Sequence, residues 1–307
     1  MAHEIEKSDL LTPKGGLARE ALSDTILQQL HDPTDLTRLC VRVPWQSLGS
    51  GTLDVTQDAK PGAYTARTSE ISGASIANSE WDSSRFSLTP AGYSKRYQVT
   101  DLIPIAGGYT TLGALAAKLV AGVGITMTDL LCALFPSVAS SVTPGTGVAL
   151  DVSTMYDAQF ALNTQSVPGP WAAVLSQKQV NNFQASLRSE AGAAQFIPAT
   201  ADLLRLRGPG VKGTWNGIEI TQSDSVEASG GNAQGCMFGF GAFAYTFGNA
   251  AAAASQVPPG LLYMANEIMM IEINRDQTNF MTALIASIFP SVVEAEDLRA
   301  VQILSDE

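Results

Sequence analysis

Charged residues are scarce in this sequence. Asp, Glu, Lys and Arg make up 15% of its 307 residues, whereas about a quarter is usual in soluble domains. Apolar residues reach 45%, so the chain is too apolar to be disordered and too sparsely charged to be a fully solvated monomer. Because subunit interfaces are depleted in charged side chains, this composition favours a protein whose surface is largely covered by other copies of itself.

Histidine and clustered basic residues are also rare. The only histidines are His3 and His31, and most acid–base, metal and nucleophilic sites use histidine near neutral pH. The 18 basic residues contain no run of three, and the net charge is −11. A nucleic-acid-binding protein needs clustered Lys and Arg to neutralise phosphates. We therefore expect no enzymatic activity, no cofactor, no bound metal and no specific binding of nucleic acid.

The three cysteines, Cys40, Cys132 and Cys236, lie about a hundred residues apart. This spacing fits neither a disulfide framework nor a zinc site, which predicts a reducing compartment. The first residues lack the basic flank and apolar core of a signal peptide. The most apolar window, residues 112–135, is interrupted by polar and charged side chains, which argues against a membrane span.

The clearest periodicity falls between residues 112 and 134, where apolar residues recur in steps of three and four before Pro136. We expect one long helix there. A shorter amphipathic stretch, residues 17–30, predicts a helix in a polar N-terminal arm. Between residues 49 and 100 large apolar side chains are few. Residues 85–89 and 93–99 alternate around a Pro-Ala-Gly turn, which predicts a hairpin without a core of its own.

The middle of the chain predicts a compact α+β domain. A helix begins after Asp151 or Ser153, and an apolar strand at residues 171–175 leads into a second helix whose Ser176 and Gln179 form a capping box. Residues 211–221 turn at an Asn-Gly pair, which is the strongest short hairpin signal. In the last quarter, residues 268–274 and 280–289 predict a long hairpin, and residues 300–304 predict a final strand.

Two glycine-rich strings match dinucleotide-binding patterns, at residues 208–213 and 239–244. The first precedes a hairpin turn rather than a helix, and the second lacks an acidic residue at the ribose-binding distance, so we interpret both as loop and strand segments. Glu294, Glu296 and Asp297 have a spacing compatible with metal ligands and equally with a solvated turn. We favour the solvated turn.

The order of these parts resembles the major capsid proteins of tailed bacteriophages, the HK-ninety-seven-type fold that encapsulin shells share. Three passages carry the resemblance: residues 98–102 before the long helix, the Gly-Pro-Trp-Ala-Ala-Val-Leu-Ser-Gln-Lys-Gln string at residues 169–179, and residues 275–278 with the later segments 289–292 and 299–303. The resemblance implies an α+β phage major capsid fold. Its expected parts are an N-terminal arm (1–50), an extended loop hairpin (51–101), a peripheral domain with a long spine helix (102–150), an axial domain (151–264), a peripheral return hairpin (265–290), and a closing strand and tail (291–307).

The resemblance further implies a major capsid protein that self-assembles into pentamers and hexamers. These would form the icosahedral shell around the double-stranded DNA genome of a tailed phage, with a portal and a separate scaffolding or cement protein as partners and no membrane. The protein would reside in the virion after assembly in the host bacterial cytoplasm. Two alternatives remain open: an encapsulin-like nanocompartment shell, and another phage structural protein of the tail or decoration type.

Some elements are expected to reach neighbouring subunits, and their charged residues are possible contact sites. For each of these residues, simple exposure to solvent is an equally good interpretation. The residues concerned are Arg85, Lys95, Arg96, Arg275 and Asp276. By the same resemblance, Lys60 and Lys95 on the extended loop are possible partners for covalent cross-linking, although an exposed lysine is ordinarily just solvated.

Overall fold

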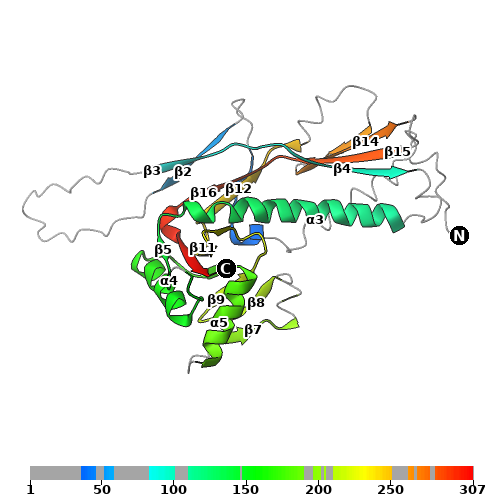
Figure 1. Ribbon diagram of the computed structural model, residues 1–307. Helices are drawn as coiled ribbons and strands as arrows, with labels where there is room; N and C mark the ends of the chain where they lie inside the picture. The colour runs from blue at the N-terminus through cyan, green and yellow to red at the C-terminus, as the bar shows by residue number, and fades with distance from the viewer. Residues whose placement is uncertain are drawn as a thin grey trace, which may run out of the picture.

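The computed structural model describes residues 36–45, 52–58, 83–100, 110–145, 147–189, 196–201, 204, 210–250, 262–265, 268–276 and 281–306. These residues form an α+β fold, as predicted. One long helix lies under a layer of long strands, and a second sheet with two shorter helices lies on the other side of that helix (Figure 1). The predicted arm helix, both histidines and Lys60 lie outside the described residues.

The long helix α3 (Thr110–Cys132) forms where the apolar periodicity predicts it. Leu119, Val123 and Met127 lie on one face and are buried against strands of the sheet above. The helix ends before Pro136, which falls within the short 3-10 helix η3 (Phe135–Ser137). None of the helices in the described part of the chain is both long and apolar enough to cross a membrane.

The sheet that covers α3 is antiparallel and four-stranded. Its strands, in spatial order, are β13 (Leu262–Ala265), β14 (Met269–Asp276), β15 (Met281–Ile288) and β4 (Tyr93–Thr100). The predicted hairpin of the last quarter is confirmed as β14 and β15, which pair over eight residues. The buried side chains Met269, Ile271 and Leu284 on these strands complete the α3 core.

The predicted hairpin around residues 90–92 is wrong, although both of its strands exist. Strand β3 (Ser83–Leu88) pairs with β2 (Leu53–Asp58), and β4 pairs with β15 instead. The Ala91 N–H between β3 and β4 donates to the Pro290 carbonyl at 3.1 Å. Pairing with β15 packs Tyr97 of β4 against the α3 core, whereas a two-stranded hairpin offers no such burial.

A three-stranded sheet joins the arm to this layer. It contains β1 (Val41–Arg42), β12 (Phe243–Phe247) and β16 (Pro290–Glu294), with β1 parallel to β12. The 3-10 helix η2 (Leu36–Leu39) precedes β1 and buries Leu36. The arm therefore contributes both a strand and core side chains.

The second region is built on an eight-stranded sheet. Its strands are β5 (Ser141–Val142), β17 (Ala300–Asp306), β11 (Asn232–Gly239), β6 (Trp171–Leu175), β9 (Ile218–Gln222), β8 (Val211–Trp215) and β7 (Phe196–Pro198) in spatial order, with β10 (Ala228–Ser229) paired to β11. The predicted strands at 171–175 and 300–304 are confirmed, and β17 lies inside the sheet between β5 and β11. The Asn216-Gly217 turn joins β8 to β9 with positive φ angles of 49° and 80°, as a hairpin turn of this kind requires.

Helices α4 (Val152–Thr164) and α5 (Gln177–Ser189) cover one face of this sheet. Asp151 caps α4, because its Oδ1 accepts the Thr154 N–H at 2.9 Å. The capping box of α5 is also confirmed: the Ser176 N–H donates to Gln179 Oε1 at 3.1 Å, and the Gln179 N–H donates to Ser176 Oγ at 3.2 Å. The Gln179 amide also donates to the Ala233 and Ile303 carbonyls at 3.0 and 3.2 Å, which ties α5 to β11 and β17.

The glycine-rich strings take the structures expected of them. In the described part of the first string, residues 210–213, β8 begins at Val211. Residues 239–244 form the connection from β11 to β12. Neither string begins a helix, so the structure provides no helix N-terminus to bind a pyrophosphate there.

Candidate assembly surfaces

An ion pair holds the arm on the face of the eight-stranded sheet that is opposite α4 and α5. Arg38 Nη2 lies 2.5 Å from Glu219 Oε1, and the two side chains are 16% and 9% exposed. Glu219 also accepts a hydrogen bond from Thr221 Oγ1 at 3.2 Å. Because successive side chains of a strand point to opposite faces, Glu219 faces the arm while Ile218 and Ile220 face the helices.

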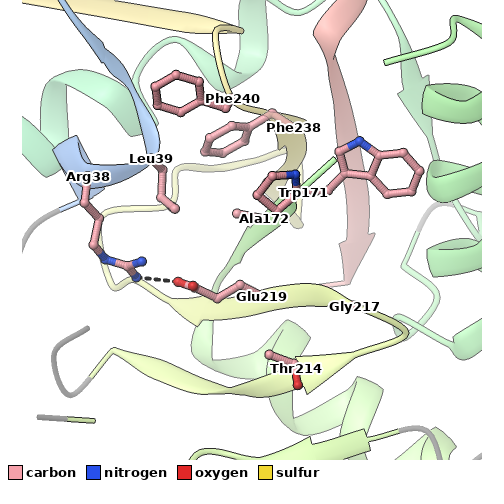
Figure 2. A pocket seen from close by; sticks show the side chains of 10 residues that line it. Arg38, Leu39, Trp171, Ala172, Thr214, Gly217, Glu219, Phe238 and Phe240 are labelled. Carbon is pink, nitrogen blue, oxygen red and sulfur yellow. Dashed lines mark ion pairs between the residues drawn. The ribbon is translucent and has the colours of Figure 1, made fainter. Parts of the chain in front are cut away.

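A cavity of about 370 Å³ lies beside this ion pair. Arg38 and Leu39 of the arm form one wall, and Phe238 and Phe240 of β11 and its following turn form another (Figure 2). The Nε and Nη1 atoms of Arg38 are buried and have no hydrogen-bond partner among the described residues. Both atoms are enclosed by protein rather than open to the cavity, and buried donors without partners are rare in folded proteins.

The three cysteines meet in one apolar core, although their spacing in the sequence gives no sign of it. Cys40 comes from the arm, Cys132 from the end of α3 and Cys236 from β11, and all three are buried and outside any disulfide. Burial raises the pKa of Cys132 to about 12 and the pKa of Cys236 well above its usual value. Thiols in such surroundings are chemically inert, so this cluster joins the arm, the long helix and the sheet by packing.

The acidic cluster near the C-terminus is not the solvated turn that we favoured. Glu294 and Asp297 are only partly exposed. Glu294 Oε2 accepts from Ser137 Oγ at 3.3 Å, and Asp297 Oδ1 accepts from the Ala139 N–H at 2.9 Å. These bonds connect the end of β16 and the 3-10 helix η5 (Asp297–Arg299) to the turn that follows α3.

The Glu294 carboxyl has an unusual pKa. Burial, and then the hydrogen bond and negative charge of Asp297, raise the pKa of Glu294 to about 7, against a smaller opposing effect of the Ser137 hydroxyl. Glu296 instead forms an ion pair with Arg299. Among the described residues no group of three His, Cys, Asp or Glu side chains is arranged to hold a metal ion.

The five charged residues predicted as contact sites do not converge. Arg85 is on β3, Lys95 and Arg96 are on β4, and Arg275 and Asp276 end β14. Arg85, Lys95 and Arg96 are exposed. Lys95 and Arg96 are consecutive on a strand and so point to opposite faces of the sheet.

Several large apolar side chains are exposed, which their spacing in the sequence does not predict. Phe160 on α4 is 70% exposed, Ile125 on α3 is 60% exposed and Phe240 is 56% exposed. Phe160 follows Val152, Met155 and Tyr156 at helical spacing, so its pattern alone looks like that of a buried face. Only the tertiary structure shows that it points away from the sheet.

Comparison with known proteins identifies the fold. No protein-family model matches the sequence, and no curated protein matches it. The capsid of Ralstonia phage GP4 matches with a TM-score of 0.63 and 9% identity, over 89% of this chain and 91% of that chain. The head structure of Helicobacter pylori bacteriophage KHP40 matches with a TM-score of 0.59 and 7% identity, over 90% and 91% of the two chains.

An encapsulin has the same fold. The holo-SrpI encapsulin complex from Synechococcus elongatus PCC 7942 matches with a TM-score of 0.53 and 13% identity, over 87% of this chain and 85% of that chain. At such low identity these likenesses establish the fold alone. This chain therefore has the fold of phage capsid and encapsulin shell proteins, as the resemblance of the sequence predicts.

Proposed function

We propose that this protein is the subunit of a closed shell, namely the major capsid protein that forms pentamers and hexamers in the icosahedral head of a tailed phage. The observation that carries the proposal is the likeness to shell proteins over about nine-tenths of both chains. The low content of charged residues, 15%, supports it, because a shell subunit covers much of its surface with neighbours.

The strand pair β2 and β3 also favours a shell subunit. In the described residues this pair forms a two-stranded sheet of its own, and it lies at one end of the layer of strands above α3 (Figure 1). Leu53 and Leu88 anchor one end of the pair in the subunit, because both side chains are buried, whereas Arg85 and Ser87 of β3 are exposed. A two-stranded sheet is marginally stable by itself. We infer that the part of the pair beyond the buried Leu53 and Leu88 gains stability by lying on a neighbouring subunit, as the extended loop of the proposed domain division would.

The same inference gives roles to the remaining parts. In the proposed division the arm is residues 1–50, the extended loop 51–101, the peripheral domain 102–150 with the return hairpin 265–290, the axial domain 151–264, and the closing strand and tail 291–307. Arg85, Lys95, Arg96, Arg275 and Asp276 are the proposed charged contacts between subunits. Portal and scaffolding or cement proteins are proposed partners, and DNA is enclosed without specific binding.

The second proposal is an encapsulin-like compartment, and the match to the SrpI encapsulin favours it. The two functions differ in what the shell encloses. Particles purified from cells after nuclease digestion would contain protected DNA in the first case and a protein guest in the second. Ultraviolet absorbance and mass spectrometry of the purified particles distinguish these contents.

Electron microscopy and sedimentation of the purified protein test the shell itself. The protein is expressed alone and together with the products of neighbouring genes. We expect closed polyhedral particles, or rings of five and six subunits that close when a scaffold is added. A uniform small oligomer under every one of these conditions contradicts the proposal.

A further inference from the structure

The four-stranded sheet above α3 ends in a long edge. Strand β4 is the last strand of this sheet and, among the described residues, pairs with β15 alone. It is eight residues long, so its outer edge presents a row of backbone N–H and C=O groups to an incoming strand. The side chains of residues 93–96 and of Gln98 are exposed. An edge of this length and exposure is a template for strand addition.

The charged side chains of β4 are both basic. They are Lys95 and Arg96, and they lie opposite Ala286 and Ile285 of β15. The neighbouring strand of the sheet therefore offers neither of them an opposite charge. Because Tyr97 packs against the α3 core, Arg96 points to the other, outer face of the sheet.

The strand pair β2–β3 has a second outer edge, and this edge is acidic. Strand β3 lies beside β16, so β2 is the outer strand of the pair, and Asp54 and Asp58 are its only charged residues. Asp54 is exposed and lies opposite Ser87, whose hydroxyl donates to Asp54 Oδ1 at 2.6 Å. Its neighbour Leu53 is buried, so Asp54 points away from the buried side of the pair.

The charges select which of these edges can pair. Two β4 edges would bring basic side chains together and two β2 edges would bring aspartates together, and like charges on neighbouring strands are destabilising. A β2 edge beside a β4 edge places opposite charges across the boundary. Within one subunit the two strands lie toward opposite ends of the layer above α3 (Figure 1) and do not pair with each other. The match is therefore available to two copies that lie end to end.

We propose that β2 of one subunit adds to the edge of β4 in the next subunit, with Asp54 across from Arg96. The inference rests on the proposed shell function and deepens it, because it names the strand that receives the β2–β3 pair. The two-stranded and the four-stranded sheet then form one sheet across the subunit boundary. The contact uses two different edges of the same molecule, so it is heterologous and forms a ring when the rotation between copies closes.

Reversing the charges singly and then together tests the contact. Asp54→Arg and Arg96→Glu each replace an attraction by a repulsion, so each should raise the protein concentration needed for assembly about three- to tenfold. The double variant restores the pair in the opposite sense and should assemble within about twofold of the wild type. Both positions are exposed, so the melting temperature of the unassembled subunit should stay unchanged in all three variants.

The matched control is Arg188→Glu at an exposed position of α5. It changes the net charge by the same amount as Arg96→Glu but lies on neither edge. We expect this variant to assemble at the concentration that the wild type requires.

Cross-linking identifies the paired strands directly. Subunits with Thr56→Cys are mixed with subunits that carry either Ser94→Cys or Gln98→Cys, and the particles are oxidised after assembly. With Asp54 across from Arg96, position 56 meets position 94 if the strands are antiparallel and position 98 if they are parallel. The native cysteines are buried, so we expect one of these two links to dominate in mass spectrometry of the peptides.

Four results overturn this contact. They are assembly of both single variants at the wild-type concentration, no recovery in the double variant, an equal loss in Arg188→Glu, and assembled particles without either link. Each leaves the shell function intact. If the wild type forms only a small oligomer, the shell proposal fails, and the presence or absence of a link in that oligomer decides this contact separately.

Discussion

Glutamine in place of Glu294 is expected to make the protein less sensitive to alkaline pH. The folded-state pKa of Glu294 is raised from 4.5 to about 7, so the folded protein binds more protons than the unfolded chain between these values. The free energy of unfolding therefore falls as pH rises from about 4.5 to 7, and the whole penalty is present above pH 7. Glutamine is neutral at every pH and keeps a donor for Asp297.

The size of the effect follows from the same shift. Each pKa unit corresponds to about 1.4 kcal/mol, which sets an upper limit of about 3 kcal/mol. Because the carboxyl is only partly buried, solvent screening reduces this to about 1–2 kcal/mol. One kcal/mol moves the melting temperature of a chain of this size by about 2–4 °C. We thus expect Glu294→Gln to melt a few degrees above the wild type at pH 8.

Thermal unfolding of the unassembled subunit, followed by circular dichroism from pH 4 to pH 8.5, measures this difference. At pH 4 the two proteins should melt together, because Glu294 is then protonated in both states of the wild type. The control is Glu227→Gln at an exposed position, which should not change the pH profile. A melting-temperature difference that is the same at pH 4 and pH 8 would refute the reasoning that Asp297 and burial raise the pKa of Glu294.

Three further predictions concern stability. Ellman's reagent should react with the three native cysteines only at the rate of unfolding, and fast reaction of any of them in the native subunit contradicts their burial. Arg38→Ala should lower the free energy of unfolding by about 2–3 kcal/mol, because it removes the cation that pairs with the largely buried Glu219 carboxylate. The double variant Arg38→Met with Glu219→Gln should recover most of this loss in denaturant titrations, and no recovery would refute the ion pair as the cause. Gln179→Leu should cost about 2–4 kcal/mol, since several buried groups lose their partner, while Gln177→Leu at the exposed start of α5 should cost less than about 0.5 kcal/mol.

Several elements were predictable from the sequence because a few neighbouring residues determine them. The repeat of apolar residues over four turns and more predicts α3. The Ser176–Gln179 capping box predicts the start of α5, and the Asn216-Gly217 pair predicts the turn between β8 and β9. In each case the decisive interactions lie within a few positions of one another, so the local sequence contains them in full.

The candidate surfaces were less predictable. The charged contact residues stay a prediction from the elements that carry them, β3, β4 and β14. The exposed ring of Phe160 follows the same spacing as the buried residues of α4, so its exposure depends on what α4 packs against. The Arg38 cavity joins the arm to β9 and β11, which are far apart in the sequence.

What the sequence by itself determined is therefore the position of α3, α4 and α5 and of several strands, the α+β class, and the low charge typical of a surface covered by neighbours. The tertiary structure decided which partner each strand takes. Strand β4 pairs with β15 rather than β3, and this pairing packs Tyr97 of β4 against the α3 core. It also brought Cys40, Cys132 and Cys236 into one core and set Glu294 beside Asp297. Burial and pairing over such separations depend on how whole surfaces fit together, and no local pattern encodes that fit.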